Sequence, residues 1–193
     1  MFTVITSEVR WFLEGKLPVE VERWFGDLGK QVITEPDRTD TYLILPETRE
    51  VGIKVRQGRV EIKKLLGEKG IIETGKNVGG KNERWQKWSF DVEQSGKLPV
   101  SFMLKSLNWI AVKKKRKLHR FEIKGDQLNP LKAGDPFPAN GAHIELARVT
   151  LHDNPWWTLG LEAFGNESNI ETNLKLLAET LLSNCPFGFF NEG

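Results

Sequence analysis

The sequence predicts an α+β fold that is mainly antiparallel β, with an eight-stranded closed or nearly closed barrel and two or three helices packed on the outside. Three observations support this fold class. Short stretches with the two-residue alternation of strands are separated by glycine and proline turns. Few segments have the helical period. Several of the stretches carry charged side chains at every second position, where strands of an ordinary core would carry apolar ones.

The expected strands follow from this alternation and from the turn residues between them. Gln57-Gly58 suits a tight hairpin between two neighbouring strands. Residues 67–82 contain five glycines and predict a long mobile loop, and residues 125–141 predict irregular structure. The eight strands span Val4–Leu13, Thr39–Leu45, Glu50–Gln57, Arg59–Leu66, Glu83–Val92, Trp109–Ile123, His143–Leu151 and Trp156–Phe164.

Two segments predict helices. Pro18 suits the first turn of a short amphipathic helix that ends near Gly26 to Gly29. Residues 170–183 repeat apolar side chains at the helical period and predict the clearest helix. Val100–Leu107 is compatible with a third, short helix.

The composition is that of a globular protein. With 193 residues, 39% hydrophobic and 28% charged, we expect one domain over residues 1–193. No run approaches the roughly 18 apolar residues that a membrane span needs, so we expect no membrane partner. The N-terminus lacks a basic stretch followed by an apolar one, so we expect no signal peptide and a cytoplasmic location. The single cysteine excludes an internal disulfide and a cysteine-rich zinc site.

The charged strand faces leave two interpretations open. In the stretch around Lys54 and Arg56, the basic residues share one face and the apolar residues share the other. If such faces point outward, they are ordinary solvated surfaces. If they point into a barrel, they surround something small and charged. Their recurrence on several strands favours the inward orientation. The other residues on these faces are Thr6, Glu8, Arg10, Glu61, Lys63, Lys114, Arg116, Glu145 and Glu162.

The order of these motifs resembles the CYTH superfamily, also called triphosphate tunnel metalloenzymes. The matching stretches are "TDTYL" (Thr39–Leu43), "GIKVR" (Gly52–Arg56), "VEIKK", "VKKKR", "IEL" and "LGLEA". The resemblance implies an eight-stranded antiparallel barrel that forms a charged tunnel.

The resemblance also implies a function and a set of site residues. It implies metal-dependent binding and hydrolysis of a small triphosphate, with cyclase chemistry as a less favoured variant. Arginine and lysine side chains bind phosphate oxygens, and a few carboxylates suffice for Mg²⁺ or Mn²⁺. The implied phosphate-binding residues are Arg10, Lys54, Arg56, Lys63, Lys114 and Arg116. The implied metal ligands are Glu8, Glu145 and Glu162, and the implied catalytic residues are Glu8, Glu61 and Glu162.

Two positions depart from the family pattern. The family has Glu-x-Glu-x-Lys near its N-terminus, whereas this chain has Thr6-x-Glu8-x-Arg10. A late Glu-x-Glu pair is reduced to Gly160-x-Glu162. Two potential metal ligands are therefore missing. Thus an alternative is a non-catalytic nucleotide or polyphosphate-binding protein with a degraded metal site.

A third alternative is nucleic-acid binding through the basic stretch "KKKRKLHR". Basic runs do form such patches. The net charge of only +2 argues against a nucleic-acid partner. The sequence alone does not determine which lysines of Lys113–Lys117 face inward.

Overall fold

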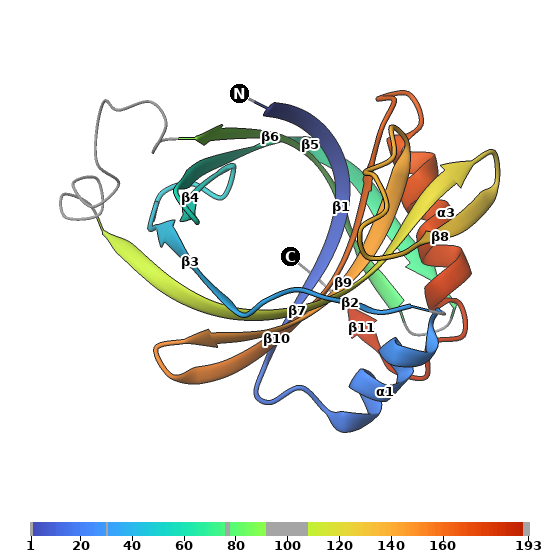
Figure 1. The fold of residues 1–193 in the computed structure, drawn as a ribbon, viewed down its shortest axis with the longest axis horizontal. Helices are drawn as coiled ribbons and strands as arrows, with labels where there is room; N and C mark the ends of the chain where they lie inside the picture. Colours follow the sequence, from blue (N-terminus) through green and yellow to red (C-terminus); the bar gives the residue numbers. More distant parts are fainter. Residues whose placement is uncertain (1, 30, 76–77, 92–107, 191–193) are drawn as a thin grey trace.

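The computed structural model describes residues 2–29, 31–75, 78–91 and 108–190, and its eight long strands close into an antiparallel barrel. Figure 1 shows these strands as a ring. The predicted fold class is confirmed. Around the ring the order is β1 (Phe2–Glu14), β10 (Asn154–Phe164), β9 (Gly141–Leu151), β7 (Trp109–Lys124), β3 (Arg38–Leu43), β4 (Val51–Arg56), β5 (Arg59–Thr74) and β6 (Val78–Asp91), which pairs again with β1.

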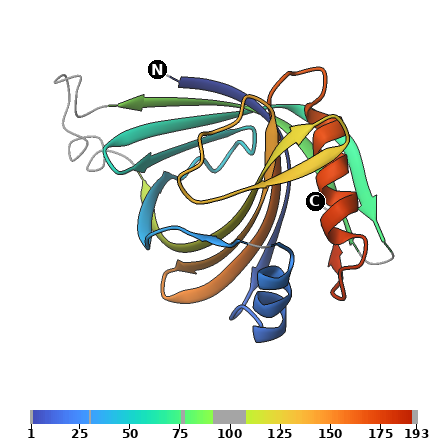
Figure 2. The same ribbon diagram turned by 45° about the vertical axis from the view of Figure 1, so that its right-hand side comes forward.

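Three short strands extend this sheet. β2 (Ile33–Thr34) and β8 (Gln127–Leu131) pair with β7, and β11 (Phe189–Phe190) runs parallel to β6. Two helices, α1 (Val19–Asp27) and α3 (Ile170–Leu182), lie outside the ring in both views (Figures 1 and 2). No helix of the described residues is long and apolar enough to cross a bilayer. The third expected helix, Val100–Leu107, lies outside the described residues.

The apolar core lies between the barrel wall and the helices rather than inside the barrel. Val9 and Trp11 of β1 belong to this core, as do Leu159 and Leu161 of β10. α3 covers them with one face, since its apolar residues recur every three or four positions. Successive side chains of a strand point to opposite faces, so the residues between these apolar positions point into the barrel. The buried residues of α3 include Leu174, Leu177, Ala178 and Leu182.

The expected loop over residues 67–82 is wrong for the described residues, because β5 continues to Thr74, β6 begins at Val78, and the two strands pair along this segment. Two register shifts interrupt their pairing, at Leu65/Gly67 and Glu68/Ile71, and glycines accommodate these irregularities. Close packing explains Gly80, where an added Cβ would lie 2.6 Å from Val9 Cγ1. In these strands, glycines lie at bulges and at a point of close packing. The local composition of such strands is the same as that of a loop.

The irregular structure expected for residues 125–141 is wrong in part. β8 forms within this segment and pairs with the end of β7, from Lys124↔Gln127 to Arg120↔Leu131. The predicted hairpin at Gln57-Gly58 is confirmed between β4 and β5. Both turn residues have positive φ, 47° and 75°, as this type of tight turn requires.

Candidate functional site

The interior of the barrel holds a cavity of about 880 Å³. All ten charged residues that the sequence predicted for the site line it: Glu8, Arg10, Lys54, Arg56, Glu61, Lys63, Lys114, Arg116, Glu145 and Glu162. In all, nine basic and four acidic side chains line the cavity. The inward orientation of the charged faces therefore holds, and the cavity lining has more basic than acidic groups.

Glu8 on β1 is the centre of the first group of contacts, which we call the Glu8 group (Thr6, Glu8, Lys63, Lys87 and Glu162). One Glu8 oxygen lies 2.6 Å from Lys63 Nζ, and the other lies 2.6 Å from Lys87 Nζ. The hydroxyl of Thr6 donates a hydrogen bond of 2.8 Å to Glu8 as well. Lys87 Nζ also lies 2.8 Å from a Glu162 oxygen, so this lysine bridges two carboxylates.

These contacts keep the Glu8 group charged although it is buried. Burial acts to raise the pKa of Glu8, but the charges of Lys87 and Lys63 outweigh it and hold the pKa well below its usual range. Burial acts to lower the pKa of Lys87, but Glu162 and Glu8 raise it above its usual value. The group thus contains two ammonium and two carboxylate groups that neutralise one another.

The second group, the Glu145 group, consists of Arg10, Arg116 and Glu145. Arg10 Nη1 lies 2.6 Å from one Glu145 oxygen, and Arg116 Nη2 pairs with the other. Arg10 stands opposite Gly160 in the β1–β10 register, and a Cβ at position 160 would lie 2.8 Å from the Arg10 guanidinium. The guanidinium therefore occupies the space that a larger side chain at position 160 would need.

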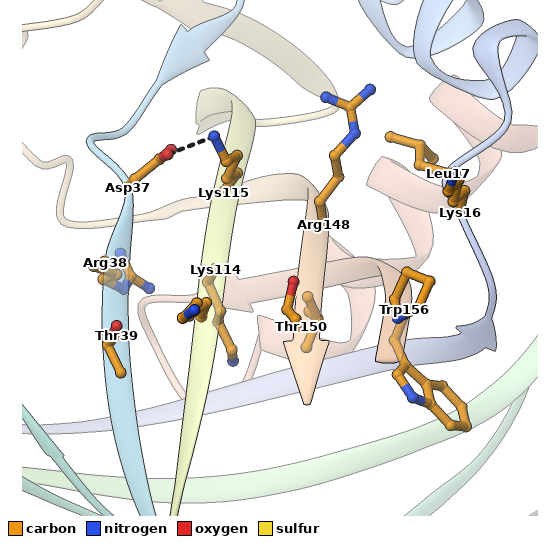
Figure 3. A pocket seen from close by; sticks show the side chains of 13 residues that line it. Lys16, Leu17, Asp37, Arg38, Thr39, Lys114, Lys115, Arg148, Thr150 and Trp156 are labelled. Atoms are coloured by element: carbon orange, nitrogen blue, oxygen red, sulfur yellow. Dashed lines mark ion pairs between the residues drawn. The ribbon is translucent and has the colours of Figure 1, made fainter. Parts of the chain in front are cut away.

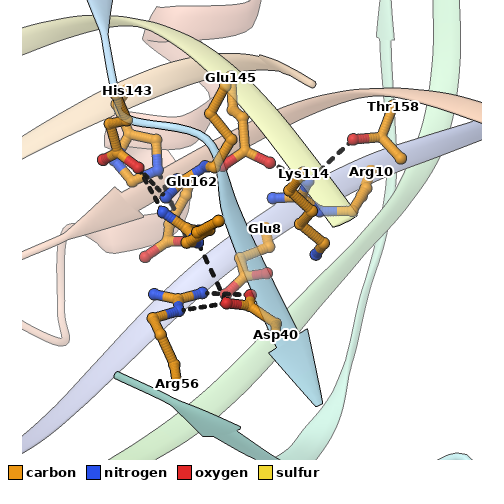
Figure 4. Close-up of polar contacts among 12 residues, drawn as sticks. Glu8, Arg10, Asp40, Arg56, Lys114, His143, Glu145, Thr158 and Glu162 are labelled. Carbon is orange, nitrogen blue, oxygen red and sulfur yellow. Dashed lines mark hydrogen bonds and ion pairs between the residues drawn. The ribbon is translucent and has the colours of Figure 1, made fainter. Parts of the chain in front are cut away.

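The third group, the Asp40 group, lies on β3, β4 and β5 and contains Arg38, Asp40, Lys54, Arg56 and Glu61. Figure 4 shows the guanidinium of Arg56 facing the Asp40 carboxylate, with hydrogen bonds of 3.0 and 2.9 Å. Arg38 donates a further bond of 3.1 Å to Asp40. Lys54 and Arg56 also pair with Glu61, at 2.9 and 3.3 Å. Burial acts to raise the pKa of Asp40, but Arg56 and Lys54 lower it to about 2.

Lys114 on β7 differs from the other buried cations of the cavity. Its Nζ donates a 2.7 Å hydrogen bond to the Tyr42 hydroxyl and lies 5.0 Å from the centre of the Tyr42 ring. Among the described residues, no carboxylate lies within 4.0 Å of this nitrogen. Burial and the nearby charge of Lys54 lower the pKa of Lys114 to about 7. An anion that binds beside Lys114 would stabilise its charged form.

Several residues that line the cavity or pair with its lining were not singled out by sequence reasoning. Lys87 lies on an expected strand, but Trp85 and Ser89 share its face, so no run of charges marked it. Asp40 and Tyr42 lie within the "TDTYL" stretch that carried the resemblance, and this stretch was the available signal. Arg38 directly precedes it.

The structure resolves the orientation of the basic stretch on β7. Lys114 and Arg116 line the cavity, whereas Lys115 pairs with Asp37 at 2.6 Å and Lys117 pairs with Glu22 at 2.9 Å. Figure 3 shows Lys115 turned toward Asp37 beside a second hollow of about 570 Å³. Carboxylates thus already engage two of the lysines that the nucleic-acid alternative would use.

The three predicted metal ligands do not fit a divalent ion in this arrangement. Within the described residues, no three His, Cys, Asp or Glu side chains gather in a way that could hold a metal. Lysines hold Glu8 and Glu162, and arginines hold Glu145. A metal ion would need the same oxygen atoms.

Comparisons with known proteins add no functional name. No family model matches the chain, and no curated protein matches it. Two solved structures are similar over most of their length. A conserved hypothetical protein from Pyrococcus furiosus, Pfu-838710-001, has 14% identity and a TM-score of 0.44, with 90% of each chain covered. The PH1012 protein from Pyrococcus horikoshii OT3 has 17% identity and a TM-score of 0.43, with 90% of this chain and 89% of that chain covered.

Proposed function

We propose that the barrel binds a small phosphorylated anion, such as a chain of two or three linked phosphates, in its interior cavity. The observation that carries this proposal is the excess of basic side chains around the cavity, with Lys114 lacking a carboxylate within ion-pair distance among the described residues. Arginine and lysine are the side chains that bind phosphate oxygens most strongly. A volume of about 880 Å³ is within the range of small-molecule sites.

Binding without turnover is the function that this geometry supports best. Ion pairs engage both oxygens of Glu8, both oxygens of Glu145 and one oxygen of Glu162, so a metal ion would have to compete with lysine and arginine for these atoms. Glu61 is held in the same way by Lys54 and Arg56. Metal-dependent hydrolysis stays a prediction from the resemblance to the CYTH superfamily.

Calorimetric titration with tripolyphosphate, pyrophosphate and orthophosphate tests the proposal. We expect tripolyphosphate to bind most tightly, because it can contact more of the cations. Lys54→Met should weaken binding about tenfold, the effect of losing one close ionic contact. Lys115→Met on the outer face is the matched control and should leave the affinity unchanged. Absence of heat and of thermal stabilisation with all three anions would overturn the proposal.

Release of orthophosphate from tripolyphosphate, ATP and thiamine triphosphate separates binding from hydrolysis. We expect no release with Mg²⁺ or Mn²⁺ above the rate without protein. Release that depends on metal and disappears in Glu162→Gln would instead make the protein a hydrolase.

A further inference from the structure

Lys87 on β6 neutralises two acidic side chains of the cavity. Its Nζ lies 2.6 Å from Glu8 and 2.8 Å from Glu162, two residues on the neighbouring strands β1 and β10. These three strands are adjacent in the closed barrel, in the order β6, β1, β10. One ammonium group therefore bridges two carboxylates that the barrel brings together. A divalent cation would occupy the same kind of position.

Both carboxylate oxygens of Glu8 are already engaged. One oxygen accepts from Lys63, and the other accepts from both Lys87 and the Thr6 hydroxyl. The Glu8 side chain is only 5% exposed. Removal of Lys87 from this carboxylate would leave a buried charge with less compensation, which is energetically costly. The lysine is thus held in place by the charges that it neutralises.

Arg10 fills a second part of the cavity in the same manner. Its guanidinium lies over Gly160, where an added Cβ would be only 2.8 Å away, and it pairs with Glu145. An approaching metal ion would meet Arg10 at Glu145 and Lys87 at Glu162. At both places a fixed positive charge would repel the metal ion.

We infer that Lys87 takes the place of a divalent metal ion beside Glu8 and Glu162, so that the barrel binds its phosphorylated ligand without metal. This inference rests on the proposed function. Its chemical consequence is that the free polyanion, rather than its magnesium complex, is the ligand. Magnesium neutralises part of the ligand's charge and therefore weakens its attraction to the basic wall.

Two measurements on the wild-type protein test the inference. Tripolyphosphate affinity should be the same within about twofold, or tighter, in chelator compared with excess Mg²⁺. Titration with Mn²⁺ alone, followed by electron paramagnetic resonance, should show no tight site in the absence of anion. An affinity that is at least about tenfold higher with Mg²⁺, or a tight Mn²⁺ site in the wild type, would overturn the inference while leaving the proposed function standing.

A variant pair sharpens the test. Lys87→Met removes the ammonium group and should create a Mn²⁺ site beside Glu8 and Glu162. Lys81→Met is the matched control on the same strand, because Lys81 pairs with Glu68 and does not line the cavity. The control should bind no Mn²⁺. A folded Lys87→Met that gains no Mn²⁺ site would contradict the inference, and if this variant does not fold, the wild-type measurements decide.

The tests also separate this inference from the proposed function. If tripolyphosphate fails to bind both with chelator and with Mg²⁺, the proposed function fails and the inference about its ligand fails with it. If tripolyphosphate binds only with Mg²⁺, the function stands and the role of Lys87 as the replacing cation is refuted.

Discussion

The Glu8 group and the Asp40 group lie on different parts of the same barrel wall, yet their charges are balanced differently. In the Glu8 group, Lys63 and Lys87 match Glu8 and Glu162 in number. In the Asp40 group, the three basic residues pair with Asp40 and Glu61, and Arg38 also pairs with Glu35. Beside this group, Lys114 donates a hydrogen bond to Tyr42 and has no carboxylate within 4.0 Å among the described residues. The comparison suggests that the Glu8 group holds the wall together, whereas the region around Lys114 supplies the positive charge for a ligand.

The largest expected effect comes from Asp40, whose side chain has no exposed surface. Asp40→Asn should lower the free energy of unfolding by about 3 kcal/mol, because Arg56, Arg38 and Lys54 would lose the buried charge that they share. Chemical denaturation measures this change. Glu179→Gln is the control, since Glu179 pairs with Lys175 on the exposed side of α3, and it should change stability by less than about 0.5 kcal/mol. A loss below about 1 kcal/mol for Asp40→Asn would show that the Asp40 group is not held by this charge.

A smaller loss is expected at Gly160, beneath the Arg10 guanidinium. Gly160→Ala places a methyl group where the guanidinium lies and should push Arg10 away from Glu145. We expect a loss of about 1–2 kcal/mol in the free energy of unfolding, as for a weakened charged hydrogen bond. Gly52→Ala is the matched control on β4, because an added Cβ there meets no atom within 4 Å. Equal free energies of unfolding for Gly160→Ala and Gly52→Ala would mean that the Arg10 guanidinium can move aside without loss of stability.

Lys114→Met should act on binding and on stability in opposite directions. We expect tripolyphosphate affinity to fall about fivefold to tenfold, because a buried cation of the cavity wall is lost. Stability at about pH 6.5 should rise slightly, since a buried charge no longer needs to be accommodated. Calorimetric titration and thermal unfolding of the same samples measure both. An unchanged affinity would remove Lys114 from the ligand site.

The pH dependence gives the smallest but most specific signal. The pKa of Lys114 lies at about 7 and that of Lys54 at about 8, in both cases because burial disfavours the charged form. Affinity should therefore fall as pH rises from about 6.5 to about 8.5, by less than tenfold for each proton lost. Stability should rise over the same range, because an unfolded lysine keeps its proton up to about pH 10.4 and so the unfolded state binds more protons.

Comparison of the wild type with Lys114→Met isolates this effect. The ligand's own protonation is the same in both titrations, so it cancels in the ratio of the two affinities. We expect that ratio to shrink as pH rises, because Lys114 in the wild type loses its charge. A ratio that stays constant with pH would show that Lys114 does not titrate in this range.

The barrel and its charged interior could be predicted from the sequence because strand alternation is a local signal. Lys54 and Arg56 share a face whatever the rest of the fold does, and their counterparts on other strands obey the same rule. The glycine-rich ends of β5 and β6 could not be predicted as strands, because Gly80 is explained by contact with Val9 on a strand far away in the sequence. Lys87 was missed for a related reason, since its partners Glu8 and Glu162 come from distant strands.

The double pairing of β1 has a consequence for how the chain folds. β1 pairs with β6 on one side and with β10 on the other, so Glu8 stands opposite both Glu83 and Glu162. Contacts between residues so far apart in sequence form slowly, because a long loop must close before they contribute. During synthesis on the ribosome, β1 emerges well before β10. The apolar side chains of Val9 and Trp11 therefore stay unpacked until β10 has been synthesised. Closure of the barrel is therefore expected to be a late and rate-limiting step. The nascent chain is most prone to aggregation before β1 pairs with β10.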